Sequence, residues 1–237
     1  MFDMQDIKNK VKVIAFDADD TLWDNQSYYD DAEKVFCSVL ADYADRETVS
    51  SALLSTETRN MQDLGYGAKA FTLSMIETAL ELSGCCISGK KLEEILNAGK
   101  SVLKMSCCPL PGVRDALEKI KASGKYEMAL FTKGDLLDQR NKLVRSGLEE
   151  YFGHVGIVAD KTVKEYGELC SRMGVDAGEL VMVGNSFRSD IEPVLKIGGF
   201  GIHVPFERTW QHEVVEEYDH ERLFRVASFA EIPGLLL

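Results

Sequence analysis

The chain has 237 residues, of which 45% are hydrophobic and 28% are charged, as expected for one large globular domain or a core domain with an insertion. Its 27 basic and 39 acidic residues give a net charge of −12. Such an acidic surface repels nucleic acid and anionic membranes, so we expect neither kind of partner, and an anionic substrate would need a local positive site.

The cysteines and the first residues indicate a reduced, soluble, cytoplasmic protein. Two adjacent cysteine pairs do not resemble a secreted disulfide framework, and neither a C-x-x-C spacing nor a histidine pair at ligand spacing suggests zinc. The start of the chain, MFDMQDIKNK, lacks the apolar core of a signal peptide. No apolar run approaches the roughly 20 residues needed to span a bilayer.

The first predicted element is a buried strand at residues 11–16, V-K-V-I-A-F, where apolar and β-branched residues predominate. From about residue 25 the apolar positions recur every three or four residues, which predicts helices instead. Four such stretches lie at about 28–43, 47–64, 71–80 and 92–103. We therefore expect the block from about 25 to 107 to be entirely helical.

After Pro109 and Pro111 the elements alternate. Helices are predicted at 113–122, 136–146, 162–173 and 187–197. Strands are predicted at 126–132, 155–158, 180–183, 200–204 and, more briefly, 222–226. Alternation of this kind indicates a parallel sheet. The predicted fold class is α/β, with a Rossmann-like core over 1–23 and 109–237, helices on both faces of its sheet, and an all-helical domain at 24–108 inserted after the first strand.

Polar side chains follow four of the predicted strands at their carboxyl ends, the edge where open parallel sheets bind ligands. In chain order they are Asp17 and Asp19, then Thr132 and Lys133, then Lys161, then Asn185 and Asp190. Crowded carboxylates repel one another unless a cation lies among them. Oxygen ligands suit Mg²⁺, so this collection predicts a divalent cation beside a phosphate.

The same residues resemble the four motifs of the haloacid dehalogenase superfamily. They are Asp17-x-Asp19-x-Thr21, Thr132, Lys161 and Gly184-Asn185-x-x-x-x-Asp190, in that order. The helical block resembles the helical cap of that family, which is inserted after the first motif, closes over the core and contributes substrate contacts. The resemblance covers the α/β core, and four ordered motifs are far more specific than one.

The resemblance implies a role for each motif residue. Asp17 corresponds to the nucleophile that forms an aspartyl-phosphate, and Asp19 to the general acid and base. Thr132 and Lys161 correspond to the phosphate-binding pair. Lys133 is a further phosphate-binding candidate, although a small or amide residue is common at that position. The expected metal ligands are Asp17, Asp19 through its main-chain carbonyl, Asn185 and Asp190.

The fourth motif departs from the family pattern, in which Gly-Asp is common. Asn185 replaces that aspartate, so it either binds Mg²⁺ as a neutral ligand or holds a metal-bound water, while Asp190 carries the charge. One expected negative charge is missing, which favours weaker metal binding.

The resulting hypothesis is a Mg²⁺-dependent phosphatase, a hydrolase that acts on a small phosphorylated metabolite. Dehalogenases of the family lack the second acid because halide leaves without a proton, so Asp19 favours phosphate esters. A 2-haloacid dehalogenase, a phosphomutase and a non-catalytic phospho-receiver-like protein remain alternatives. The sequence identifies neither the substrate nor the oligomeric state.

Some residues have plausible structural roles. Lys164 competes with Lys161 for the third motif. Asp20, Asp24 and Asp135 are expected to have structural roles, and Asp24, where the core passes into the helical block, is a hinge candidate. Residues 84–91 nearly match a phosphate-binding loop but lack its final serine or threonine and follow a helix. Near the last strands, three side chains could border the site: His203, Trp210 and His212.

Overall fold

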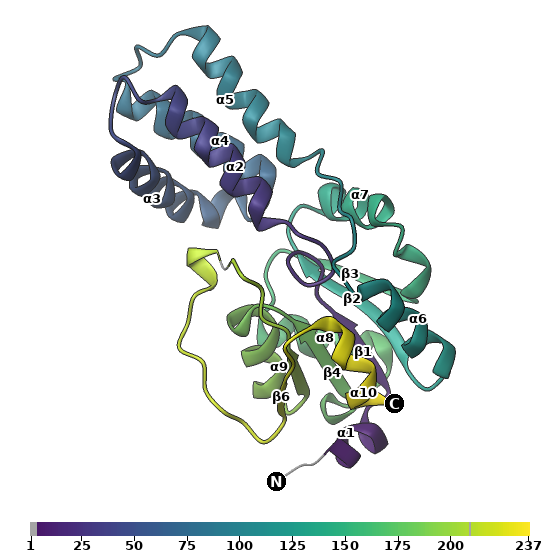
Figure 1. Ribbon diagram of the computed structural model, residues 1–237. Coiled ribbons are helices and arrows are strands. Elements are labelled where there is room, and N and C mark those ends of the chain that lie inside the picture. The colour runs from purple at the N-terminus through teal and green to yellow at the C-terminus, as the bar shows by residue number, and fades with distance from the viewer. Residues whose placement is uncertain (1–3, 209) are drawn as a thin grey trace. The chain divides into compact units, whose positions relative to one another are not determined.

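The structure is a computed structural model that describes residues 4–208 and 210–237. Its core is a six-stranded sheet in the order β3-β2-β1-β4-β5-β6 (Figure 1). Every pair of neighbouring strands is parallel. The strands are β1 (Val13–Phe16), β2 (Glu127–Lys133), β3 (His154–Val158), β4 (Leu180–Gly184), β5 (Phe200–His203) and β6 (Leu223–Arg225). The predicted parallel α/β fold is confirmed.

Strand β1 lies at the centre of the sheet, between β2 and β4. All four of its residues are buried, because helices cover both faces and leave no polar side to the strand. Phe16 aligns with Leu130 of β2 and Val183 of β4. The chain reverses its strand order at this point, so the end of β1 is where an open sheet of this type binds ligands.

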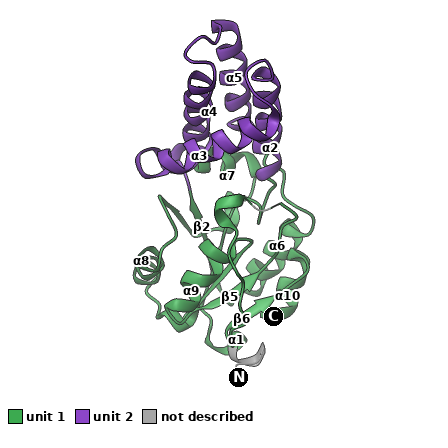
Figure 2. Ribbon diagram, turned by 90° about the vertical axis from the view of Figure 1, so that its left-hand side faces the viewer, with its two compact units in different colours: residues 1–24, 107–133, 139–237 green, residues 25–106, 134–138 purple. Residues whose placement is uncertain are grey.

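Helices flank both faces of the sheet. They are α1 (Met4–Lys10), α6 (Val113–Ser123), α7 (Leu136–Ser146), α8 (Val163–Met173), α9 (Glu192–Lys196) and α10 (Ile232–Leu236). Figure 2 shows α8 and α9 on one side and α6 and α10 on the other. Short turns of helix complete the unit: η1 (Glu149–Tyr151), η2 (Ala177–Glu179), η3 (Phe187–Ile191), η4 (Gln211–Glu213) and η5 (Phe229–Glu231).

Each face of the sheet has its own apolar core. Val13 and Ala15 pack with buried residues of α8 and α9, among them Tyr166 and Val194. On the opposite face the ring of Phe16 lies 6.0 Å from that of Phe152 and 5.9 Å from that of Phe229. Burial of one such side chain contributes roughly 1.5–3 kcal/mol, so the two cores fix the end of β1 firmly.

The chain divides into two compact units, coloured separately in Figure 2. The sheet unit comprises the residues up to Asp24, Cys107–Lys133 and Gln139–Leu237. The helical unit comprises Asn25–Ser106 and the short segment Gly134–Asp138. Its helices are α2 (Gln26–Val39), α3 (Arg46–Leu64), α4 (Ala68–Leu82) and α5 (Gly89–Val102). Strands are absent from the described residues of the 25–106 stretch, as its periodicity predicts.

The starts of two helices in this unit follow from local sequence. The Asp45 side chain accepts a hydrogen bond from the Thr48 backbone N–H at 2.8 Å and caps α3. The Ser88 hydroxyl accepts one from the Lys91 N–H at 3.3 Å and caps α5. The near match to a phosphate-binding loop is therefore the start of a helix that follows another helix.

The predicted helix at 187–197 is interrupted. A π-helical turn, η3, covers Phe187–Ile191, and α9 begins only at Glu192. Pro193 has no N–H to donate to the preceding turn. The carbonyls of Ser189 and Asp190 instead accept from the Tyr166 hydroxyl, at 3.0 and 3.2 Å. Single π turns are frequent at functional sites, and this one carries Asp190.

Glu57 of α3 makes the stability of the helical unit depend on pH. It is half-buried, and desolvation together with the negative charge of Glu33 raises its pKa from 4.5 to about 7. Because the folded pKa lies above the unfolded one, ionisation of Glu57 destabilises the fold as the pH rises from 4.5 towards 7. Glu57→Gln is expected to raise the free energy of unfolding by about 1–2 kcal/mol at pH 8 and little at pH 5.

Urea denaturation at the two pH values measures this effect. Glu93→Gln, a change of the same kind at an exposed position of α5, is the control and should alter stability little at either pH. Equal stabilisation by Glu57→Gln at pH 5 and pH 8 would contradict the assignment.

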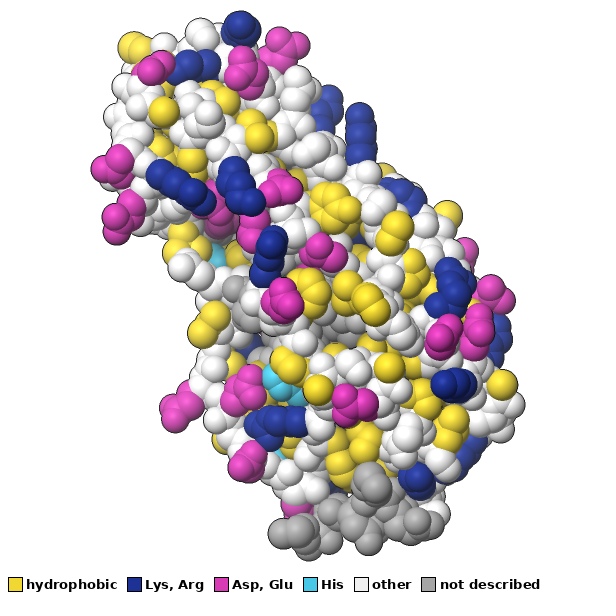
Figure 3. Space-filling view, in the orientation of Figure 1, with side chains coloured by type: hydrophobic (Ala, Val, Ile, Leu, Met, Phe, Trp, Pro, Cys, Tyr) yellow, Lys and Arg dark blue, Asp and Glu magenta, His cyan; other side chains and the backbone are white. Residues whose placement is uncertain are grey.

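Charged side chains of both signs are interspersed on the visible face of each unit (Figure 3), in keeping with a net charge of −12 made up of many residues of each kind. Among the described residues, every helix is too short or too polar to cross a bilayer.

Candidate active site

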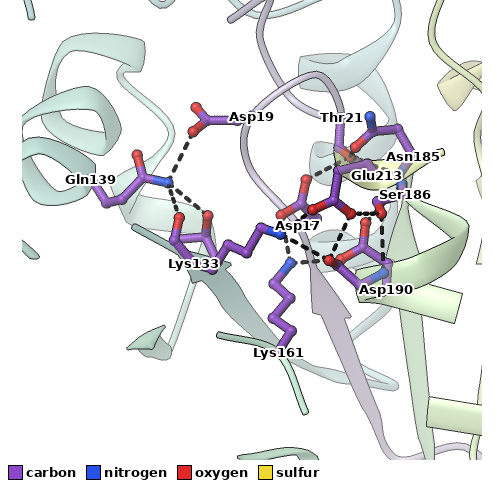
Figure 4. Close-up of polar contacts among 12 residues, drawn as sticks. Asp17, Asp19, Thr21, Lys133, Gln139, Lys161, Asn185, Ser186, Asp190 and Glu213 are labelled. Carbon is purple, nitrogen blue, oxygen red and sulfur yellow. Dashed lines mark hydrogen bonds and ion pairs between the residues drawn. The ribbon is translucent and has the colours of Figure 1, made fainter. Parts of the chain in front are cut away.

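Asp17 is the first residue after β1 and lies at the carboxyl edge of the sheet. Its backbone N–H donates to the Val183 carbonyl at 2.9 Å, which continues the ladder to β4. The Asp17 Oδ1 atom lies 2.5 Å from Lys161 Nζ, and the same ammonium lies 2.6 Å from Asp190 Oδ1 (Figure 4). One buried lysine thus bridges two buried carboxylates from different strand ends.

Lys161 takes this position because it directly precedes the capped start of α8. The hydroxyl of Thr162 accepts from the Lys164 N–H and ends the loop. The Lys161 side chain is 1% exposed, whereas that of Lys164 is 77% exposed and pairs with neighbouring glutamates. Lys161 Nζ also lies 5.7 Å from the ring centroid of Phe131. Of the two lysines, Lys161 alone is placed at the carboxylates.

The charges of Asp17, Asp190 and Lys161 influence one another's pKa values. Burial and the negative charge of Asp190 raise the pKa of Asp17 to about 7, while Lys161 acts in the opposite direction. Burial likewise raises the pKa of Asp190, against the effect of Lys161. Burial acts to lower the pKa of Lys161, but the two carboxylates outweigh it and the pKa is raised. The site therefore holds a stable ammonium beside carboxylates that favour additional positive charge.

Thr21 links the first motif to the fourth. Its hydroxyl lies 2.9 Å from Asp17 Oδ2 and 3.0 Å from Asn185 Oδ1, and it accepts from the Asn185 backbone N–H at 3.1 Å. The carbonyl of Asn185 lies 2.9 Å from His203 Nε2. Asn185 is thus held beside Asp17 with its amide oxygen turned towards the same hydroxyl, and His203 does border the site.

Asp190 is held by the loop that carries Asn185. Its Oδ2 atom accepts from the Ser186 backbone N–H at 3.0 Å. Gly184 is required here, since a Cβ at that position would overlap the Asp190 carboxylate. The glycine of the fourth motif therefore has a steric role.

Asp19 faces a different set of partners. Its carboxylate accepts from Trp23 Nε1 at 2.8 Å and from Gln139 Nε2 at 3.0 Å, and it lies 2.9 Å from Lys142 Nζ. Figure 4 shows its side chain apart from the Asp17–Asp190 cluster. Of the predicted metal-site residues, Asp17, Asn185 and Asp190 lie together, while the Asp19 carboxylate is directed elsewhere.

Thr132 and Lys133 end β2 but point to different neighbours. The buried Thr132 hydroxyl accepts from Gln139 Nε2 at 2.8 Å. Lys133 reaches across to the fourth motif, where its Nζ donates to the Ser189 hydroxyl at 2.9 Å and pairs with Glu213. The two lysines and Asp17 lie close together in Figure 4.

The oxygen atoms at this edge suit a hard cation. Asp17 and Asp190 offer carboxylates, Asn185 offers an amide oxygen, and the main-chain carbonyl of Asp19 follows in the same loop. Within residues 4–208 and 210–237, groups of three or more His, Cys, Asp or Glu arranged to hold a metal are absent. The donors named above, two acids and neutral oxygens, suit Mg²⁺ better than a softer metal.

Three residues at the site were not anticipated from the sequence: Gln139, Lys142 and Glu213. The first two lie three apart on one face of α7, and both are buried. Polar residues recurring on a buried helix face are the signal that could have identified them. Glu213 lies in η4, with no pattern around it that indicates a role.

Lys142 is expected to position Asp19. Lys142→Met keeps the length of the side chain but removes both contacts to the Asp19 carboxylate. We therefore expect kcat to fall about 10–100-fold, with a smaller change in KM. Steady-state kinetics measures this effect. Arg140→Met, on the exposed face of the same helix, should leave both constants within about twofold, and equal losses in the two variants would contradict a positioning role.

Comparisons with known sequences and structures agree on one family. The sequence model of the haloacid dehalogenase-like hydrolases matches residues 11–198. A glyceraldehyde 3-phosphate phosphatase of Methanothermobacter thermautotrophicus is 26% identical over 210 residues, covering 84% of this chain and 88% of that protein. A protein of the same name from Pyrococcus abyssi is 30% identical over 94 residues, 38% of this chain and 39% of that protein.

Solved structures share the fold. A haloacid dehalogenase-like family hydrolase from Xanthomonas campestris superposes with a TM-score of 0.86 at 38% identity, covering 95% of this chain and 90% of that one. The L-2-haloacid dehalogenase of Xanthobacter autotrophicus superposes with a TM-score of 0.63 at 17% identity, covering 95% and 98%. The second likeness concerns the fold alone.

Proposed function

Since this chain belongs to the haloacid dehalogenase-like hydrolases, we propose that it is a Mg²⁺-dependent phosphatase that acts on a small phosphate monoester through an aspartyl-phosphate at Asp17. The observation that carries the proposal is the buried bridge from Asp17 through Lys161 to Asp190. It supports the proposal because the carboxylate proposed as nucleophile, an ammonium and a second carboxylate lie together at the carboxyl edge of the sheet. A bound phosphate would balance the charge of the Lys161 ammonium, and a bound cation would balance the charges of Asp17 and Asp190.

In the first step, an Asp17 carboxylate oxygen attacks phosphorus. The new O–P bond forms as the ester O–P bond breaks, and Asp19 gives its proton to the leaving oxygen. Lys161 balances the charge on the phosphoryl oxygens, and the Thr132 hydroxyl donates to one of them while it still accepts from Gln139. The products of this step are a free alcohol and the aspartyl-phosphate.

In the second step, Asp19 accepts a proton from water, and the water oxygen attacks the same phosphorus. Inorganic phosphate leaves, and Asp17 regains its carboxylate. The same Asp19 thus serves first as acid and then as base, which restores the enzyme after each turnover. In this structure Trp23, Gln139 and Lys142 hold that side chain apart from Asp17, so the proposed proton transfers require it to rotate towards the phosphorus.

Mg²⁺ would be held by Asp17, Asp190, the main-chain carbonyl of Asp19 and, directly or through water, by Asn185. Its contribution when bound is positive charge opposite the phosphate and relief of the repulsion between the two buried acids.

The substrate class is inferred from the relatives. Two proteins similar to this chain are named glyceraldehyde 3-phosphate phosphatases, so we propose that short phosphorylated aldehydes and sugars belong to the substrates. We also propose that the helical unit acts as the cap of the family and helps to select among them. Asp19 argues against the dehalogenase alternative, since halide release requires no acid.

The test is phosphate release from p-nitrophenyl phosphate and from a panel of three- to six-carbon phosphate esters, with Mg²⁺ and with EDTA. We expect turnover that needs Mg²⁺, and highest kcat/KM for one member of the panel. Halide release from 2-chloropropionate without metal, together with no phosphate release from any ester, would overturn the proposal.

A further inference from the structure

Glu213 lies against the fourth motif although it is more than 20 residues further along the chain. Its carboxylate accepts hydrogen bonds from the hydroxyls of Ser186 and Ser189, the latter at 2.7 Å, and it pairs with Lys133. The Glu213 side chain is 11% exposed and that of Lys133 is 16% exposed. Three donors thus converge on one carboxylate from η4: one from β2, one from the residue before η3 and one from η3 itself.

Glu213 and Lys133 form an ionised pair. Burial acts to raise the pKa of Glu213, but Lys133 and the two serine hydroxyls outweigh it, so the pKa is lowered. Lys133 also donates to Ser189 at 2.9 Å, which fixes its ammonium at the fourth motif. The ionised Glu213 carboxylate is therefore paired with Lys133, the residue that the sequence indicates as a phosphate ligand.

Lys133 extends towards the region of Asp17 where Lys161 also ends (Figure 4). A phosphate held there would be attracted by two ammonium groups instead of one. Glu213 cancels the charge of the second, and its oxygens take up donors that phosphate oxygens could use. A carboxylate and a phosphate offer the same kind of acceptor to lysine and serine, so the two compete.

We propose that Glu213 is a positioning residue that competes with phosphate for Lys133 and thereby sets how tightly the site holds phosphate. This inference rests on the phosphatase function proposed above and adds a determinant outside the four motifs. The consequence is faster release of inorganic phosphate, at some expense in affinity for the phosphate ester.

The test is calorimetric titration of the protein with inorganic phosphate in the presence of Mg²⁺. Glu213→Gln removes the charge and is expected to tighten phosphate binding about tenfold, the effect of one charge a few ångströms away in a partly solvated site. Glu213→Asp keeps the charge and should stay nearer the wild type. Glu216→Gln, an exposed change of equal charge in the same loop, is the matched control.

Lys133→Met in both backgrounds shows whether Glu213 acts through Lys133. If it does, Glu213→Gln gains no affinity once Lys133 is absent. If the wild type binds phosphate, two results would overturn this inference and leave the phosphatase function standing. They are unchanged or weaker phosphate binding by Glu213→Gln, and an equal gain in affinity in Glu216→Gln. A wild-type protein that releases no phosphate from any ester of the panel would overturn the phosphatase function, and this inference with it.

Discussion

Replacement of Asp17 by asparagine is expected to abolish phosphate release, with kcat lowered by about four orders of magnitude or more. Asparagine has the same shape, and its amide oxygen can still accept from Thr21, but its amide nitrogen cannot attack phosphorus as a carboxylate oxygen does. Steady-state release of p-nitrophenol, with Mg²⁺ at several concentrations, measures the loss.

The control for this variant is Asp20→Asn, three residues along the same loop. Asp20 has φ of 61°, a left-handed conformation that asparagine tolerates well, so this variant also loses one negative charge without strain. It should keep kcat within about threefold of the wild type. Substantial turnover by Asp17→Asn, at a level that purification does not remove, would refute the nucleophile assignment.

Removal of the Lys161 ammonium is expected to impair both stability and catalysis. Lys161→Met leaves Asp17 and Asp190 buried without their shared cation, and breaking a buried pair from one side typically costs about 3–5 kcal/mol. Thermal or urea unfolding in EDTA measures this cost. Lys164→Met, at the exposed neighbouring lysine, is the control and should change stability by less than about 0.5 kcal/mol.

The loss of stability in Lys161→Met should increase as the pH rises. Lys161 lowers the pKa of both carboxylates, so its removal moves their folded pKa values further above the unfolded value of 3.8. A carboxyl group with a raised folded pKa loses stability as pH rises from the unfolded value through the folded one. The Lys161→Met deficit should therefore be larger at pH 8 than at pH 5. A deficit that shrinks with rising pH would exclude this account.

Catalysis by Lys161→Met should fall as well, by about two to four orders of magnitude in kcat/KM, because the phosphoryl charge loses its fixed partner. Kinetics at pH 6, where the destabilisation is smaller, separates this loss from unfolding. Full activity in a folded variant would leave Lys161 with a purely structural role.

The sheet was predictable from sequence because its strands are short apolar runs followed by polar residues. Each of the six strands lies within about two residues of its predicted range, and the alternation with helices determined that they are parallel. The π-helical turn ahead of α9 was not foreseen, because the pattern from 187 to 197 remains apolar at helical spacing throughout.

The candidate site was predictable only in part, for a similar reason. Strand ends place Asp17, Asp190 and Lys161 at one edge of the sheet, so their proximity follows from topology. Gln139 and Lys142 approach Asp19 through the packing of α7, and Glu213 through an irregular loop, which no periodicity describes. The orientation of the Asp19 carboxylate also depends on those neighbours, so motif spacing alone could not give it.

The central claim, that Asp17 carries the phosphoryl group during turnover, is tested most directly by trapping the intermediate. The protein is mixed with an excess of a phosphate ester that it hydrolyses, quenched in acid, reduced with borohydride and digested for mass spectrometry. Borohydride converts an aspartyl-phosphate to homoserine, so the account predicts homoserine at position 17 and aspartate at position 19. Unmodified Asp17 during steady turnover, or modification at Asp19 instead, would contradict it.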